Sequence, residues 1–222
     1  MMQAAGTSGI RPVGRGWGSD IFEANQYMRV WTVQPLIVWQ RLQDAGAVAV
    51  DSACYPDEYV PWQYRWLADR LKERLPRYEG GLPWWAYGYK PHLRWVRHSR
   101  PQGEPQVRIE VEIDADRAIV FPTWAWHGMY TGRFLAYTPE EQEAWETAMR
   151  LAVPDLDEWP LPQPRRAELE ESWLRLFDPD LPASGWSGWA AKPTCETEAV
   201  FGLLRVEDVR AGRHFIGSSN WR

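Results

Sequence analysis

The chain has 222 residues, 45% of them hydrophobic and 25% charged, and a formal net charge of -5 at pH 7. These proportions are those of ordinary globular proteins, and the acidic balance argues against a dedicated binder of duplex DNA, which carries a basic surface. Two cysteines, Cys54 and Cys195, are too few for a disulfide framework and fit no zinc-binding spacing, which favours reduced thiols. Since no apolar run approaches the ~20 residues of a membrane span, we expect a cytoplasmic protein.

Tryptophan is the unusual component, with sixteen residues spread from Trp17 to Trp221. Each indole has a large apolar body and an N–H group that needs a hydrogen-bond partner. A chain this rich in tryptophan either builds its core from indoles or keeps some of them at a surface that stacks on flat rings. The composition therefore indicates aromatic recognition without naming a ligand.

The first half of the chain predicts short elements after an aperiodic leader. We expect a disordered leader over 1–27, one globular domain over 28–217 and a tail over 218–222. The predicted elements are a strand over 29–33, a helix over 36–45 that ends at Gly46, a strand over 47–50, and a helix from about Pro61.

The middle of the chain is rich in strand signals. An aromatic strand is predicted over 84–89, and 107–113 alternates between an apolar face and a wet face that holds Arg108, Glu110 and Glu112. The run 118–121 continues the sheet as a candidate hairpin partner of 107–113. His92 and Arg94 lie in a stretch that resembles a strand, where they would point the same way.

The last third predicts two helices and two strands. Thr138-Pro139-Glu140-Glu141 is a capping box that starts a helix running to about Ala152. Further elements are a helix over 167–177, a loop over 181–193 that contains Trp186 and Trp189, and strands over 198–205 and 213–216. Because helices and strands do not alternate regularly, we expect an α+β fold, with flanking helices on a mixed or antiparallel sheet.

Several segments together resemble a bacterial family known as domain of unknown function 3841. They are Met28-Arg-Val-Trp-Thr-Val-Gln34, Ala45-Gly46, Tyr64-Arg-Trp-Leu67, Trp84-Trp-Ala-Tyr87, Lys90-Pro-His-Leu-Arg94, Trp126-His127 and the run over 198–209. Relative to that family's pattern, this chain has His92 and Glu198 where Asp and Gln are usual. The resemblance implies a shared fold over most of 28–216 and brings no assigned activity.

A second resemblance is to the mono-ADP-ribosyltransferase fold, in which a late strand opens with a Glu-x-Glu turn. Glu196-Thr197-Glu198 is similar to that turn, and an early strand, a helix and Gly46 precede it in the same order. The resemblance implies NAD as cofactor and Glu198 and Glu196 as catalytic residues. The carboxylate would hold the ribose 2′-hydroxyl and stabilise the cation formed when the nicotinamide bond breaks.

Other residues are candidates for holding such a ligand. Thr32 and Gln34 are candidates to line a polar pocket near a strand end, and Trp85 and Trp126 could sandwich nicotinamide or adenine. His127 is a candidate acid or base, against a histidine that only satisfies backbone groups at a helix start. The remaining candidates are Arg29, on the early strand, and Arg94, for phosphate or carboxylate binding, against surface ion pairing.

Three functions stay open at this point. The first is a NAD-dependent ADP-ribosyltransferase-like enzyme. The second is a non-catalytic aromatic pocket that binds a nucleobase, a nucleotide or another flat small molecule. The third is a tryptophan-rich module whose Trp186 and Trp189 anchor a protein partner. If the enzyme hypothesis holds, Glu198 should lie in one pocket with Thr32 or Gln34 and an aromatic face.

Overall fold

The computed structural model describes residues 27–50, 61–152, 161, 163–178, 180–181 and 196–218. Its elements, in chain order, are β1 (Tyr27–Pro35), α1 (Leu36–Ala45), β2 (Ala47–Ala49), α2 (Trp62–Arg74), β3 (Trp84–Tyr87), α3 (Leu93–His98), β4 (Pro105–Asp114), β5 (Ala118–Pro122), α4 (Thr123–Tyr130), α5 (Pro139–Ala152), α6 (Arg165–Trp173), the 3₁₀ helix η2 (Leu174–Phe177), β6 (Thr197–Phe201), β7 (Leu203–Arg205), the 3₁₀ helix η3 (Val206–Asp208) and β8 (Val209–Ile216).

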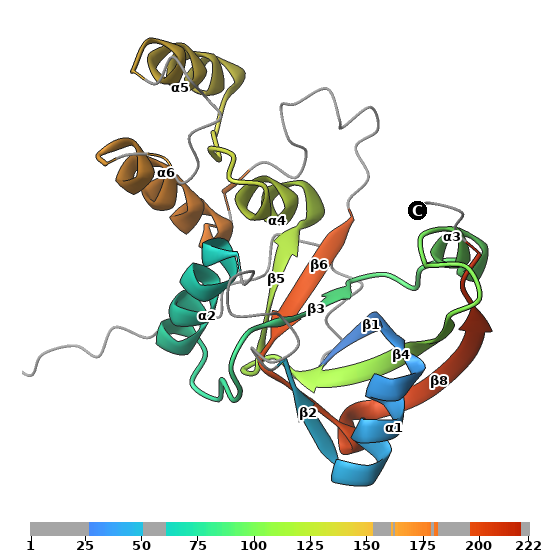
Figure 1. The fold of residues 1–222 in the computed structure, drawn as a ribbon. Helices are drawn as coiled ribbons and strands as arrows, with labels where there is room; N and C mark the ends of the chain where they lie inside the picture. Colours follow the sequence, from blue (N-terminus) through green and yellow to red (C-terminus); the bar gives the residue numbers. More distant parts are fainter. Residues whose placement is uncertain are drawn as a thin grey trace, which may run out of the picture.

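The framework is a six-stranded sheet in the order β5-β6-β3-β1-β4-β8, and each neighbouring pair of strands is antiparallel (Figure 1). A second, two-stranded sheet pairs β2 with β7. Helices and an antiparallel sheet thus combine in an α+β fold, as the irregular element order predicts. Within the described ranges, no helix has both the length and the apolarity needed to cross a membrane.

One face of the sheet packs against α1 and the small sheet. The alternation over β4 places Val107, Ile109, Val111 and Ile113 on this face, all of them fully buried. Their cluster includes Val30 of β1, Leu42 of α1 and Leu204 of β7. The predicted period-two strand is confirmed, and its apolar side forms this part of the core.

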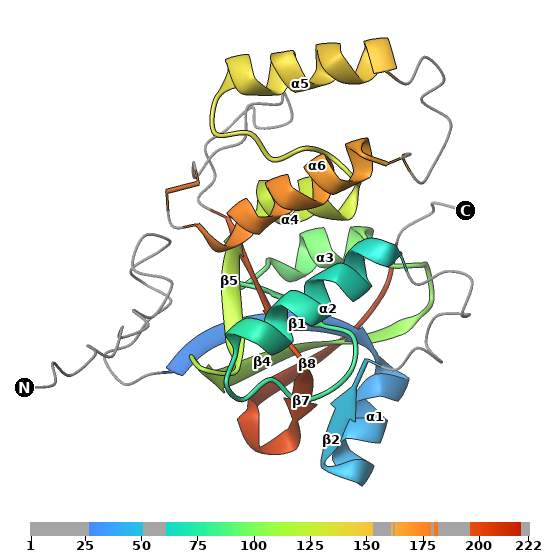
Figure 2. The same ribbon diagram turned by 90° about the vertical axis from the view of Figure 1, so that its left-hand side faces the viewer.

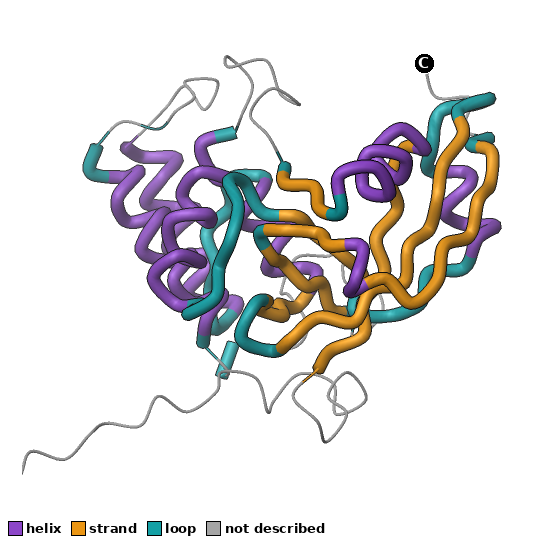
Figure 3. Tube along the Cα trace, turned by 90° about the horizontal axis from the view of Figure 1, so that it is seen from below, coloured by secondary structure: helices purple, strands orange, loops and turns teal. Residues whose placement is uncertain are grey.

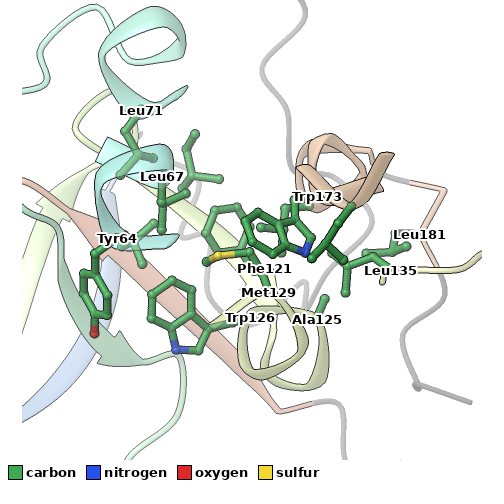
Figure 4. Close-up of a cluster of buried hydrophobic side chains, with 14 of the residues drawn as sticks. Tyr64, Leu67, Leu71, Phe121, Ala125, Trp126, Met129, Leu135, Trp173 and Leu181 are labelled. Atoms are coloured by element: carbon green, nitrogen blue, oxygen red, sulfur yellow. The ribbon is translucent and has the colours of Figure 1, made fainter. Parts of the chain in front are cut away.

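The opposite face is covered at its β5 end by α2, α4 and α6, with α5 as the outermost helix (Figure 2). Trp173 and Phe121, both fully buried, lie at the centre of this helical cluster (Figure 4). Seen from below the view of Figure 1, most of the helices gather at this end of the sheet (Figure 3).

The indoles of the described residues lie mainly in the core. Three of them are buried: Trp84, Trp126 and Trp173. Others are partly buried and pack against the two main hydrophobic clusters: Trp39, Trp62, Trp66, Trp85, Trp124 and Trp145. Trp95 differs, because 53% of its surface is exposed. Of the two uses of tryptophan that the composition left open, core building therefore dominates in these ranges.

Local signals predicted the element ends well. Gly46 ends α1 in the left-handed conformation, at a φ of 77°, which favours glycine. At α5, Thr138 Oγ1 accepts a hydrogen bond from Glu141 N, as the capping box requires. In a capping box the Glu141 side chain would accept a hydrogen bond from Thr138 N. It accepts from Tyr137 N instead, so this bond is shifted by one residue.

Two predictions about the strands are wrong. The strand 118–121 is no hairpin partner of 107–113, since β4 pairs with β1 and β8 whereas β5 pairs with β6. The run 198–205 is split at Gly202, where a Cβ would lie 1.8 Å from the Glu79 carbonyl oxygen. The chain passes there from the large sheet to the small one.

The wet face of β4 and the stretch 92–94 also differ from expectation. Arg108 is only 9% exposed, because its guanidinium donates to the Pro91 carbonyl beneath α3. His92 and Arg94 do not share a strand. His92 caps α3 through Nδ1, which accepts from Arg94 N, and Arg94 is an exposed helical residue.

Candidate functional site

Glu198 lies in the interior of the sheet. It pairs with Phe121 of β5 on one side and with Tyr87 of β3 on the other, so its strand is held along both edges. Its carboxyl group points to the face that the helical cluster covers, and the residue is 3% exposed. Removing a carboxylate from water costs free energy unless it is hydrogen-bonded or paired, so a buried acid at this position requires an explanation.

His127 of α4 supplies the partner of that acid. Its Nε2 lies 3.6 Å from Glu198 Oε1, and its side chain is 64% exposed whereas the Glu198 side chain is 4% exposed. The start of α4 is tied to β6, since Thr123 N donates to the Glu196 carbonyl at 3.0 Å. Ala125, Trp126 and Met129 turn toward the core (Figure 4). His127 is left at the surface beside the carboxylate.

The pair has perturbed acidity on both sides. Burial raises the pKa of Glu198, and the interaction with His127 opposes this rise. The interaction with the Glu198 carboxylate raises the pKa of His127 above its ordinary value. An imidazole shifted in this way, open to solvent and backed by a carboxylate, can take up and deliver a proton near neutral pH.

The second oxygen of Glu198 is unsatisfied. Oε2 is buried and has no hydrogen-bond partner among the described residues. An acceptor left in this state costs roughly 1–3 kcal/mol, and more when it is charged. A ligand hydroxyl or N–H group is the kind of donor that would relieve this cost.

Aromatic rings lie beside the carboxylate. Tyr87, the cross-strand neighbour of Glu198, has ring contacts with Trp85 at 5.2 Å, Tyr89 at 5.6 Å and Trp95 at 6.0 Å between centroids. Burial raises the pKa of Tyr89 to about 12, and the negative charge of Glu196 adds to that rise. The charge of Glu196 therefore acts on the same aromatic group as that of Glu198.

Comparison with known families adds one finding. The family model described as Domain of unknown function (DUF3841) matches residues 29–193. The chain belongs to the DUF3841 family. The matched range contains His127, most of β1 and all of β2 to β5, and it ends before Glu196 and Glu198. No curated protein and no solved structure matches the chain.

Two candidates inside the DUF3841 range lie on the wrong face of the sheet for a site at Glu198. Trp31 pairs with Tyr87, so Thr32 and Gln34 point to the opposite face. There Thr32 is 1% exposed and donates to the Trp85 carbonyl, and Gln34 Nε2 donates to Thr32 Oγ1 at 2.7 Å. The expectation that they share a pocket with Glu198 is wrong, because alternate residues of a strand point to opposite faces.

The other candidates of the DUF3841 range are distributed as follows. Arg29 forms ion pairs with Glu110 and Glu112, both at 3.7 Å. Trp126 is 4% exposed and packs edge-on against Tyr64, so its indole belongs to the core. Trp85 lies near Tyr87, as the ring contact shows, whereas Arg94 is exposed on α3.

The sequence reasoning missed Tyr87 and Tyr89. A period of two in the aromatic run 84–89 could have identified them, since Trp85, Tyr87 and Tyr89 are spaced by two residues and a strand places such residues on one face. The cysteines Cys54 and Cys195 and the loop residues Trp186 and Trp189 lie outside the described residues. Within the described ranges, no group of three or more His, Cys, Asp or Glu side chains could hold a metal ion.

Proposed function

We propose that this DUF3841 protein is a NAD-dependent enzyme of the ADP-ribosyltransferase type, and that Glu198 and His127 are its reactive pair. The observation that carries the proposal is a buried carboxylate whose one oxygen is unsatisfied and whose other oxygen meets an exposed imidazole. The order of the early strand, helix, Gly46 and Glu196-Thr197-Glu198 supports the choice of reaction. Of the pocket expected for such an enzyme, the aromatic face lies beside Glu198, whereas Thr32 and Gln34 point to the opposite face and take no part in the proposed site. An enzyme that consumes NAD works where NAD is present, and we propose a cytoplasmic location on that ground.

The roles follow from the geometry. NAD supplies a ribose whose bond to nicotinamide breaks with the electron pair leaving on nicotinamide, while C1′ bonds to an acceptor oxygen or nitrogen. Glu198 Oε2 accepts the hydrogen bond of the ribose 2′-hydroxyl, and its negative charge stabilises the positive charge that develops on the ribose. His127 takes the proton that the acceptor loses, because its exposed ring can reach a nucleophile arriving from solvent.

The neighbouring rings fit the flat parts of this ligand. Tyr87 and Tyr89 lie on the face of Glu198, and Trp95 is half exposed beside Tyr87. Stacking of a base on an aromatic side chain contributes ~1–3 kcal/mol, so two such rings would hold the ligand at useful concentrations.

The test is release of nicotinamide from NAD by the purified protein, with Glu198→Gln as the decisive variant. The amide keeps the shape of the carboxyl group and removes its charge, so turnover should fall about 10²–10³-fold. Binding, followed by quenching of tryptophan fluorescence, should weaken by no more than about fivefold. His127→Gln should slow turnover by about 10²-fold, the usual contribution of a general base.

Glu112→Gln is the matched control. It changes an acid on the same face of the same sheet that is engaged with Arg29 and Arg210, and it should leave turnover unchanged. The proposal fails if wild-type protein releases no nicotinamide, or if Glu198→Gln turns over as fast as wild type.

The exposure of Trp95 favours one second candidate, a non-catalytic module that binds a flat ligand by stacking. In that case a nucleobase should quench fluorescence without any turnover of NAD, and Trp95→Ala should weaken that binding about tenfold. Glu198→Gln should then have no effect beyond the loss of one hydrogen bond.

A further inference from the structure

The face of the sheet that carries Glu198 holds two kinds of charge. Toward the start of β1 the cations are paired, since Arg29 and Arg210 both contact Glu112. Toward the end of β1, near α3, three arginines have no ion pair among the described residues: Arg100, Arg108 and Arg213. In a chain whose net charge is -5, unpaired arginines at one place do not reflect a generally basic surface.

Arg108 and Arg213 are directly opposite each other on β4 and β8. Arg108 is 9% exposed, and its guanidinium donates to the Pro91 carbonyl at 2.7 Å. Burial lowers the pKa of Arg108, and the charge of Arg213 lowers it further. Like charges opposite each other repel, and burial of one of them makes the arrangement costly unless an anion is present.

Arg100 supplies a third guanidinium, on the β1 side of Arg108, whereas Arg213 lies on the β8 side. It donates from one terminal nitrogen to the carbonyl of Val33, which is the cross-strand neighbour of Arg108 on β1. Its Nε is buried and has no hydrogen-bond partner among the described residues. A donor that strong and that planar is suited to two oxygens of one anion.

Tyr87 connects this arginine group to the carboxylate. Tyr87 is the cross-strand neighbour of Glu198, and burial raises the pKa of its phenol. The Arg100 guanidinium opposes this rise and the Glu198 carboxylate adds to it, so both charges act on the phenol. Two strand spacings and two residues separate Val33 from Glu198, which amounts to on the order of 12 Å between their Cα atoms. One strip of the sheet therefore has an unsatisfied donor at one end and an unsatisfied acceptor at the other.

We propose that Arg100, Arg108 and Arg213 bind the phosphate of a small phosphate-bearing ligand, and that a hydroxyl of the same ligand donates to Glu198. The phosphate satisfies the buried Nε of Arg100 and neutralises the pair on β4 and β8. The second half of the proposal rests on the proposed function, whereas the first half stands on the arginines alone. Arg29 is excluded from this role by its two glutamates.

The first experiment measures the binding of inorganic pyrophosphate by calorimetry at low salt. Arg100→Gln and Arg213→Gln should each weaken binding about tenfold, because each removes a charge-assisted hydrogen bond. Arg213 is exposed, so its variant keeps the test valid if Arg100→Gln fails to fold. Arg210→Gln, three residues away on β8 and paired with Glu112, is the control and should bind as wild type does.

The arginine site is overturned if the wild-type protein does not bind pyrophosphate. It is also overturned if wild type, Arg100→Gln and Arg213→Gln bind pyrophosphate with equal affinity. A single-stranded RNA that binds far more tightly than pyrophosphate, and that loses this affinity in Arg213→Gln, also overturns it in favour of a polymer site.

A second comparison separates the two halves of the proposal. Glu198→Gln should leave the affinity for pyrophosphate unchanged and weaken the affinity for ADP-ribose about fivefold, the loss expected for one hydrogen bond. If Glu198→Gln binds ADP-ribose as wild type does, the second half is wrong. If the protein shows no NAD turnover while pyrophosphate still follows the arginines, the proposed function fails and the phosphate site stands.

Discussion

The ion pair between Arg117 and Asp208 joins the turn before β5 to the 3₁₀ helix after β7. Arg117 Nη1 donates to Asp208 Oδ1 at 3.0 Å, and Nη2, which donates to the Leu203 carbonyl, lies 2.9 Å from Asp208 Oδ2. The two side chains are 6% and 11% exposed. Because the pair is buried, loss of one partner leaves the other charged and unpaired inside the protein.

Replacement of one partner should therefore be costly. We expect Arg117→Met and Asp208→Leu each to lower the free energy of unfolding by about 3–5 kcal/mol. For a chain of this size, about 2–4 °C of melting temperature corresponds to each kcal/mol, so each variant should melt roughly 6–20 °C below wild type.

The double variant provides the decisive comparison. Replacement of both partners removes the stranded charge, and exchange of a buried pair for apolar side chains is often close to neutral. We expect Arg117→Met/Asp208→Leu to be more stable than either single variant by at least about 2 kcal/mol, measured by urea unfolding. Single costs that add within about 0.5 kcal/mol would refute a coupled pair.

Further predictions follow from the core, the site and the strand crossing. Ile109→Ala should lower the free energy of unfolding by about 2–5 kcal/mol, whereas Glu112→Ala should cost about 1 kcal/mol or less, and equal costs in urea unfolding would contradict the two faces of β4. The raised pKa values of Glu198 and His127 mean that the folded protein holds their protons more tightly than the unfolded chain does. This contribution to stability is complete below pH 4.5 for Glu198 and below pH 6.5 for His127, and it is lost as pH rises through each folded-state pKa. Glu198→Gln should flatten that dependence in melting curves recorded from pH 4.5 to 8, and a slope identical to wild type would disprove the assignment. Gly202→Ala should cost about 1–3 kcal/mol in the same urea assay, because its Cβ would meet a backbone carbonyl, and an unchanged midpoint would show that the chain relaxes there.

Sequence reasoning succeeded where a signal is local. The period of two over 107–113 fixed which residues of β4 are buried, and Gly46 fixed the end of α1. It failed at pairing, because 107–113 and 118–121 are close enough in the chain for a hairpin and the pattern says nothing about partners. The sheet instead inserts β6, β3 and β1 between them.

The candidate site shows the same limit. The sequence indicates Glu198 as the acid of a Glu-x-Glu turn at the start of a strand, and His127 as a candidate acid or base. Their contact depends on the pairing of β5 with β6 and on the start of α4 directly after β5, and neither is written in any spacing. The burial of Glu198 was missed because an acid at a predicted strand start reads as solvated.

The two residues of the candidate site belong to different layers of the fold, Glu198 to the sheet and His127 to the helical layer. Glu198 is fixed by the backbone of two neighbouring strands. His127 is carried by a helix that has a backbone hydrogen bond to Glu196 at its first residue and beyond that packs through side chains such as Met129. The distance between the His127 imidazole and the Glu198 carboxylate therefore depends on how closely α4 packs against the sheet. The ¹⁵N resonances of the His127 ring therefore report on the packing of the core. A substitution such as Met129→Ala, which changes neither His127 nor Glu198, should shift the pKa of His127 measured from those resonances.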